Sequence, residues 1–206
     1  MQQKSPAIFI TDSVALNFLN SIATPADSTI DWIGDGDGLL AWLEQAQLVP
    51  MEALEVIRKH AEPEELDRVA EQARNLREWF RTFVHDSGKS RKAAALPDVE
   101  PLNRILARDE GFEQLVAHKR GKATALRLER ARRWRSPESL LLPIGEALAK
   151  LLAEEDLSDV KTCEGADCTL MFVDRTRGRS RRWCSMGICG NRAKQIAHRH
   201  RLKGSH

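Results

Sequence analysis

The sequence predicts a mainly α-helical protein with one β-hairpin, ending in a small finger built around four cysteines. Three observations lead to this fold class. Apolar residues recur at helical spacing through most of the first 110 positions, an alternating pattern follows at about 113–134, and all four cysteines lie between 163 and 189. With 206 residues, 42% of them hydrophobic and 30% charged, the chain is long enough for one core and an appendage. We therefore expect a helical domain over 1–158 and a finger over 159–206.

The helices follow from apolar spacing, caps and prolines. The longest begins at Pro63, a residue that suits the first turn, and repeats apolar residues at i, i+3, i+4 and i+7. Ser136 and Pro137 could begin another, but Pro143 would break it, so we expect that helix to begin at Pro143. More than half of it is apolar, which favours the core or a homodimer interface. Loops are expected at 24–36 and 87–97. The predicted helices are residues 12–22, 37–46, 51–60, 63–86, 98–110 and 143–154.

The hairpin is predicted from two alternating segments, Glu113–Lys119 and Thr124–Trp134, on either side of Gly121. Leu126 and Leu128 fall on one face of the second strand. Its arginines have two interpretations: they form a second surface that contacts phosphates, or they are solvated charges that discourage strand pairing. These arginines are Arg130, Arg132, Arg133 and Arg135.

The four cysteines form two C-x4-C pairs, Cys163 with Cys168 and Cys184 with Cys189. Two such pairs, separated by a connector long enough for one hairpin, are typical of a tetrahedral zinc site. Four protein ligands leave no open position, so we expect one structural Zn²⁺. The alternatives are two disulfides or four unrelated thiols. The polar N-terminus and the lack of a long apolar run predict a cytoplasmic protein, where disulfides are rare.

The residues around the cysteines predict a compact finger. Residues 169–173 are expected to form a strand, 174–179 a turn, 180–183 the returning strand, and 188–201 a helix. A knuckle, a hairpin and a helix around one zinc resemble a treble-clef finger.

Charge is segregated along the chain. From Lys161 onward there are 11 Lys and Arg against 3 Asp and Glu, a net charge of +8, whereas residues 1–110 carry −7. Duplex DNA carries about one negative charge per 1.7 Å of axis, so this finger has the charge of a DNA-binding domain. Near the helix start, Arg192 joins the expected DNA contacts, while Asn191 either contacts DNA, hydrogen-bonds a thiolate or caps the hairpin. We expect Arg175, Arg177, Arg179, Arg181 and Arg182 to contact phosphates, and Lys194, Gln195, His198 and Arg199 to reach base edges.

Several motifs resemble a known family. Cys163-x4-Cys168, the segment Ser180-Arg-Arg-Trp-Cys-Ser-Met186 and the segment Cys189-Gly-Asn-Arg-Ala-Lys194 are similar to the CGNR zinc finger. The preceding region resembles the helical ABATE domain of bacterial stress-induced transcription regulators, through Ala15-Leu-Asn-Phe-Leu-Asn20 and Leu76-Arg77-Glu78. This chain has Asn17 where the family usually has aspartate. The resemblance implies a transcription regulator that binds double-stranded DNA through its finger.

Two polar residues stand out in apolar surroundings. Arg77 lies within the apolar stripe of the longest helix, and leaving its guanidinium unpaired there would cost several kcal/mol. The guanidinium therefore needs an internal partner or an acidic small-molecule ligand, or the side chain must extend to the edge of the core. Asn20 either has a satisfied amide or lies in a polar pocket. One hypothesis is that a small anionic effector binds at Asn20 and Arg77 and changes the spacing of two fingers in a homodimer. Another is that thiolate oxidation ejects the zinc.

Other functions are weighed against DNA binding. An RNA-binding finger would favour exposed aromatics, and this finger has only Phe172 and Trp183. A zinc-stabilised protein-interaction module would not need a charge of +8. His60, His85 and His118 form no pair at metal-ligand spacing, so we expect no enzymatic activity.

Overall fold

The computed structural model describes residues 6–24, 28–89, 98–121 and 123–203. The helices are α1 Val14–Leu19, α2 Gly36–Gln45, α3 Met51–His60, α4 Pro63–Lys89, α5 Glu100–Leu106, α6 Leu141–Glu154 and α7 Asn191–Lys203, with shorter helical turns η1 Pro137–Leu140, η2 Leu157–Asp159 and η3 Met186–Gly190. The strands form three antiparallel pairs: β1 Ile22–Ala23 with β2 Ile30–Asp31, β3 Gly111–Arg120 with β4 Ala123–Arg132, and β5 Val160–Thr162 with β6 Met171–Val173. The predicted mainly helical architecture with small hairpins is confirmed.

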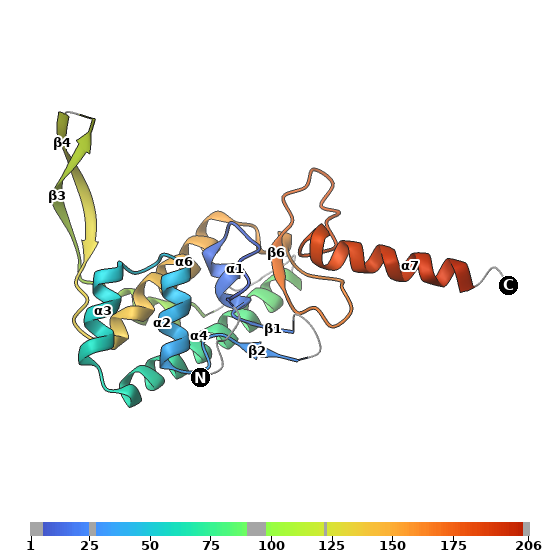
Figure 1. The fold of residues 1–206 in the computed structure, drawn as a ribbon, viewed down its shortest axis with the longest axis horizontal. Helices are drawn as coiled ribbons and strands as arrows, with labels where there is room; N and C mark the ends of the chain where they lie inside the picture. Colours follow the sequence, from blue (N-terminus) through green and yellow to red (C-terminus); the bar gives the residue numbers. More distant parts are fainter. Residues whose placement is uncertain (1–5, 25–27, 90–97, 122, 204–206) are drawn as a thin grey trace.

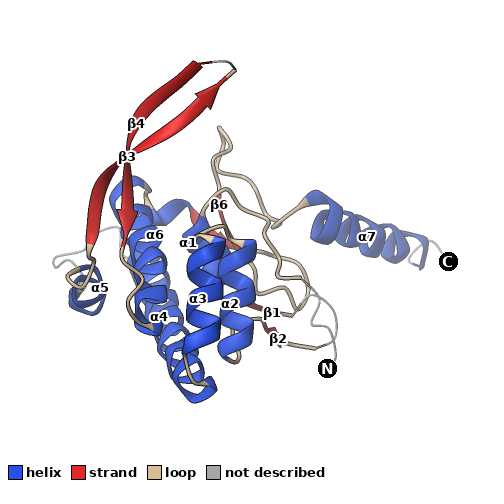
Figure 2. Ribbon diagram, turned by 60° about the vertical axis from the view of Figure 1, so that its left-hand side comes forward, coloured by secondary structure: helices blue, strands red, loops and turns tan. Residues whose placement is uncertain are grey.

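Helix α4 organises the helical body, with α1, α2 and α6 packed against it (Figure 1). Its buried face is the predicted stripe, which runs from Leu66 to Val84 at i, i+3 and i+4 spacing. Helix α2 approaches closely, because Gly36 lies so near α4 that a Cβ atom there would come within 2.4 Å of the Leu66 Cβ. Figure 2 shows the resulting bundle, from which two elements project: the β3–β4 hairpin and α7.

Helix boundaries differ from the predictions where capping decides them. Asp35, not Asp37, caps α2, and its side chain accepts a hydrogen bond from the Gly38 N–H at 2.7 Å. The turn η1 runs directly into α6, so Pro143 is the third helical residue rather than the first. A proline is tolerated in the first turn because its missing N–H has no intrahelical acceptor there. Helix α4 extends to Lys89, and the rest of the predicted 87–97 loop, from residue 90, lies outside the described residues.

The strand bounds differ from the prediction by two residues at the base, because β3 begins at Gly111 rather than Glu113 and β4 ends at Arg132 rather than Trp134. Its register pairs Leu115 with Leu128 and Ala117 with Leu126, which places these four side chains on one face. Both views show the hairpin standing away from the helices (Figures 1 and 2).

The predicted returning strand over 180–183 is wrong. Strand β6 pairs instead with β5, which precedes the first cysteine, with Val160 opposite Val173. Residues 180–183 are held as a loop, since the Asp174 carboxylate accepts the Arg181 N–H at 2.9 Å and the Arg182 carbonyl accepts the Glu164 N–H at 2.9 Å. These bonds satisfy the backbone without a ladder. Within the described residues, no helix combines the length and apolar character needed to span a bilayer.

Candidate metal centre and nucleic-acid interface

The four cysteines meet at one point, although they come from two separate turns. Their sulfur atoms all lie within 4.8 Å of one another, with 3.9 Å between the Cys168 and Cys184 Sγ atoms and 3.6 Å between those of Cys184 and Cys189. A tetrahedron of sulfurs about 2.3 Å from zinc has edges of about 3.8 Å. All four thiols are free of disulfides. The donor set therefore fits one structural Zn²⁺, and the disulfide alternative is wrong.

The first turn is shaped to bring its backbone against the sulfurs. The Gly165 and Cys184 N–H groups donate to the Cys163 Sγ at 3.4 and 3.2 Å. Gly165 is needed here because a Cβ atom would come within 2.8 Å of the Cys189 Sγ. Such N–H donors orient a metal-bound thiolate and stabilise its charge.

Burial sets the protonation of the thiols. Burial raises the pKa of Cys168 to about 12 and also raises the pKa of Cys184. Cys163 differs: burial opposes ionisation, but the backbone hydrogen bonds from Cys184 and Gly165 outweigh it and lower the pKa. Buried neighbouring thiolates repel one another, so a dication is the group that would allow all four to ionise together.

Asp174 organises the loop between the two cysteine pairs. Its side chain is fully buried and accepts hydrogen bonds from the Lys161 Nζ at 2.6 Å, the Thr176 hydroxyl at 2.6 Å and the Arg181 N–H. Burial alone would raise the pKa of Asp174, but these donors outweigh it and hold the pKa well below its usual range. The carboxylate thus holds together the loop between the two cysteine pairs.

Most of the arginines that we expected on phosphates have partners within the protein. Arg175 pairs with Glu155, and Arg179 pairs with Asp159 at 2.7 Å, so both connect the finger to the end of the helical body. Arg181 donates to the Trp183 and Cys184 carbonyls and lies 4.2 Å from the centre of the Phe172 ring. Arg182 pairs with Glu164 at 2.5 Å. Among the described residues of this loop, only Arg177 is an arginine with neither an ion pair nor a hydrogen bond.

Helix α7 presents a different surface. Arg192, Lys194, Gln195 and Arg199 are exposed, and none has an ion pair or hydrogen bond to another described side chain. Figure 1 shows α7 extending away from the rest of the protein. Asn191 is also exposed and forms no hydrogen bond to a described thiolate. The side chain of His198 lies outside the described residues. The structure thus brings the candidate base-contacting residues together on one projecting helix.

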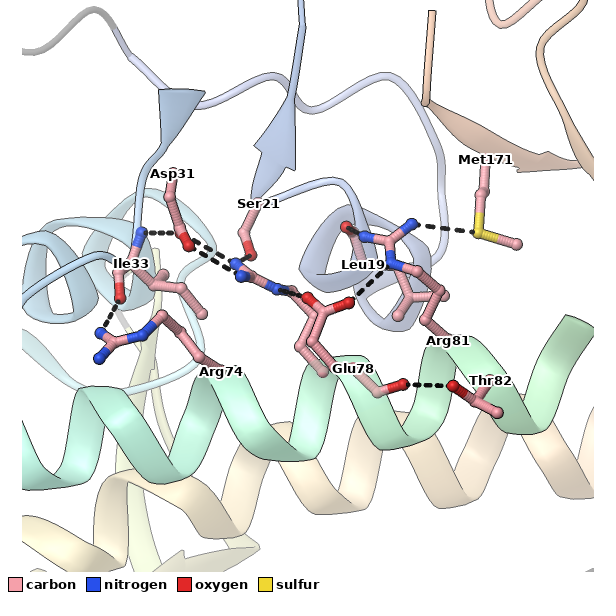
Figure 3. Close-up of polar contacts among 10 residues, drawn as sticks. Leu19, Ser21, Asp31, Ile33, Arg74, Glu78, Arg81, Thr82 and Met171 are labelled. Atoms are coloured by element: carbon pink, nitrogen blue, oxygen red, sulfur yellow. Dashed lines mark hydrogen bonds and ion pairs between the residues drawn. The ribbon is translucent and has the colours of Figure 1, made fainter. Parts of the chain in front are cut away.

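Asn20 joins the finger to the helical body. Its amide donates to the Met171 carbonyl at 2.9 Å and accepts from the Met171 N–H at 2.8 Å, so it acts like a neighbouring strand for β6. Arg81 donates to the Leu19 carbonyl beside it and contacts the Met171 sulfur (Figure 3). Asn20 is only 1% exposed, so this contact is enclosed between the finger and the body. The sequence indicated that Asn20 is unusual, because it is an asparagine in an apolar segment, but it did not indicate that Met171 is its hydrogen-bond partner.

Arg77 has internal partners as well (Figure 3). It forms two hydrogen bonds to the Asp31 carboxylate, at 2.8 and 2.9 Å, and donates to Ser21 and Glu78. Burial alone would lower the pKa of Arg77 and raise that of Asp31, but their pairing outweighs it in both, raising the first and lowering the second. Both side chains have partners within the protein, which fits the internal-partner alternative for Arg77 and the satisfied amide for Asn20. Ligand binding at Asn20 and Arg77 stays a prediction.

The arginines at the base of the hairpin are also paired. Arg132 contacts Asp109 at 2.7 Å and Glu146 at 2.8 Å, and Arg135 contacts Glu110 at 2.8 Å. Arg133 lies over the Phe112 ring, 5.0 Å from its centre. These contacts anchor the hairpin to the body and do not favour a second phosphate-contacting surface.

Comparison with protein families finds two matches that together span most of the chain. The ABATE family, described as "Putative stress-induced transcription regulator", matches residues 12–155. The CGNR zinc finger matches residues 160–202. No curated protein matches the chain.

Proposed function

This chain belongs to the ABATE family, and we propose from that premise that it is a transcription regulator that binds double-stranded DNA through α7 of its CGNR zinc finger. One observation carries the proposal. Arg192, Lys194 and Arg199 of α7 have no side-chain partner among the described residues, whereas most of the arginines in the preceding loop do. Unpaired arginines and lysines on a projecting helix are available to phosphates and base edges.

The spacing on α7 suits a helix that enters the major groove. Arg192, Gln195 and Arg199 follow one another at i, i+3 and i+7, so they share one face. An α-helix is about 10–12 Å across with its side chains, close to the roughly 12 Å width of the major groove. Arginine suits guanine and glutamine suits adenine, so this face would carry sequence preference, while Lys194 beside it would contact phosphate.

The zinc site would support α7 without contacting DNA. Cys189 lies in η3, directly before α7, and Cys163 and Cys168 lie in the turn after β5. When bound, Zn²⁺ would supply the bonds that fix these segments relative to one another. Arg175 and Arg179 would hold the finger against the body through Glu155 and Asp159, with Arg177 as the loop arginine available to phosphate.

We extend the proposal to location and to the absence of catalysis. A site of four reduced thiols favours the cytoplasm. Each of the three histidines considered in the helical domain and hairpin has a local contact: His60 with the Val56 carbonyl, His85 with Asp86, and His118 with Glu129.

Binding to a random duplex across a salt series tests the proposal. We expect wild-type binding to weaken steeply with salt, and Lys194→Ala to weaken it further and to reduce the salt slope by about 1. Lys59→Ala is the matched control, because Lys59 is an exposed cation on α3, outside the finger. Chelation of zinc should abolish binding.

The alternatives predict other outcomes. Tighter binding to single-stranded RNA than to duplex DNA would replace the proposal with the RNA-binding alternative. This outcome is not favoured by the aromatic side chains of the finger, since Phe172 is buried and Trp183 lies beneath the Arg182 guanidinium. Absence of binding to either nucleic acid would leave a protein-interaction module.

A further inference from the structure

The β3–β4 hairpin carries an unusual apolar surface. Leu115, Leu126 and Leu128 are 67%, 66% and 62% exposed, which places them among the most exposed large hydrophobic residues of the described chain. They are not scattered, because Leu115 lies opposite Leu128, and Leu126 lies opposite Ala117. These four residues are called the leucine face of the hairpin. A contiguous apolar patch on a projecting element is typical of an interaction site.

The protein itself does not cover the leucine face. Within the described residues, β3 and β4 pair only with each other, and the hairpin stands clear of the helical body in both views (Figures 1 and 2). The body holds it only at its base, where Arg130 and Arg132 contact Asp109. Isolated two-stranded hairpins are marginally stable in water, so this one would gain stability from a layer packed on its apolar face.

Charges flank the leucine face on β3. Glu113 lies one step toward the base and Lys119 one step toward the tip. Both side chains are exposed, and neither forms an ion pair or a side-chain hydrogen bond with another described residue. On β4, Arg130 lies opposite Glu113 on the same face and contacts Asp109 at 3.4 Å. The order along β3 is therefore acid, two apolar residues, base, at equal steps of two residues.

This order makes the face complementary to itself. If two hairpins stack with the tip of one over the base of the other, a twofold axis crosses the centre of the leucine face. Leu115 then lies over Ala117 of the second copy and Leu128 over its Leu126, while each Glu113 meets a Lys119. A base-to-base stack would place Glu113 over Arg130, which already contacts Asp109, and would leave Lys119 over Thr124 with no acid opposite it.

We propose that the leucine face of the β3–β4 hairpin binds the same face of a second copy of this chain, tip to base. The interface is small. A ten-residue strand is about 33 Å long and a two-stranded face is about 10 Å wide, so each partner contributes less than the roughly 800 Å² of a standard interface. The dimer is therefore a reversible one, populated at micromolar concentrations. It does not depend on DNA binding, because α7 takes no part in it.

Sedimentation velocity of the zinc-loaded full chain between about 1 and about 200 μM tests the interface. We expect the wild-type mass to rise from one chain to two, and Leu126→Asp to weaken the dimer at least tenfold. Ala125→Asp is the matched control, since it places the same charge next along β4 but on the opposite, exposed face. It should dimerise like the wild type. A wild type that stays monomeric, or equal losses in both variants, would overturn the proposal.

A charge exchange tests the tip-to-base arrangement. Glu113→Lys and Lys119→Glu should each weaken the dimer several-fold, because each places like charges opposite one another. The chain that carries both substitutions restores opposite charges and should dimerise within about threefold of the wild type, with the single effects shrinking as salt screens them. If the doubly substituted chain associates no better than the single variants, the arrangement is wrong.

Discussion

The helical body and the finger fix their backbones by different means. The body surrounds α4 with a continuous apolar core in which Leu16, Phe18, Leu39 and Phe80 are fully buried. The finger has fewer buried apolar side chains. Among its described residues, the buried hydrophobics besides the cysteines are Leu170, Met171, Phe172 and Val173. It relies on four converging sulfurs and on the buried Asp174 carboxylate.

The difference shows where each region is vulnerable. A body held by many dispersion contacts loses part of its stability with any one side chain, whereas a finger held by one metal loses its fold when a single ligand is removed. The charged groups follow the same division. In the body, the buried Arg77 pairs with Asp31 inside the core, whereas in the finger Arg192, Lys194 and Arg199 are exposed.

The largest expected effect comes from breaking the metal site. Cys184→Ser removes a fully buried ligand, and structural zinc contributes about 10–16 kcal/mol in zinc-finger peptides. We expect zinc content to fall to near zero and amide protection from Cys163 to Gly190 to be lost, while α4 amides keep theirs in hydrogen exchange. Ser185→Ala, which removes only the hydroxyl that accepts from the Ile188 N–H, should keep its zinc. Retained protection in the zinc-free variant would contradict a structural metal.

The next effect tests the body. Arg77→Ala leaves the Asp31 carboxylate without its bidentate partner, and removing one member of a buried pair costs about 3–5 kcal/mol. Because Asp31 is 24% exposed, we expect the lower end, a loss of about 3 kcal/mol of unfolding free energy in urea. Arg68→Ala on the same helix breaks only an exposed pair with Glu65 and should change stability by less than about 1 kcal/mol. Equal losses of unfolding free energy in the two variants would show that the buried Arg77 pair stabilises the body no more than an exposed ion pair does.

A smaller effect concerns the contact between the two regions. Asn20→Ala leaves the Met171 N–H and carbonyl without their partners, at a cost of about 1–3 kcal/mol. We expect faster exchange of the Met171 amide and a looser finger, with the zinc retained. Asn17→Ala is the control, because Asn17 bonds Thr11 rather than the finger. The Met171 amide should exchange more slowly in the control than in Asn20→Ala. Equal exchange rates in the two variants would show that Asn20 does not connect the finger to the body.

Acidification separates the two regions without any substitution. Protons compete with zinc for thiols such as Cys168, whose pKa is raised to about 12 without metal. The pKa of Asp31 is lowered from 3.8, so its pairing with Arg77 contributes fully above 3.8 and is lost as pH falls below that value. We therefore expect zinc release, followed with a coloured chelator, at a higher pH than the loss of helical circular dichroism. Coincident transitions would mean that the regions unfold together.

The sequence by itself determined the features that depend on local spacing. The two C-x4-C pairs predicted the metal cluster, the apolar period predicted the α4 stripe from Leu66 to Val84, and alternation predicted that Leu126 and Leu128 share a face. These succeed because ligand spacing and the 3.6- and 2-residue periods are properties of a short segment. The boundary after residue 158 stays a prediction; the apolar core runs through both regions, since Phe172 and Leu16 belong to it.

Only the tertiary structure decided which polar groups meet. Asn20 and Met171 are 151 positions apart, and Arg77 and Asp31 are 46 apart, so no local pattern could pair them. Strand pairing also depends on contacts between distant residues. Strand β6 pairs with β5 rather than with residues 180–183, because the Arg181 N–H donates its hydrogen bond to the Asp174 carboxylate. A charge read from sequence shows how many cations a region carries. Which of them remain exposed depends on where the acids of the rest of the chain lie. The fold places Glu155 and Asp159 beside Arg175 and Arg179, whereas no described acid pairs with the α7 cations whose side chains the structure describes.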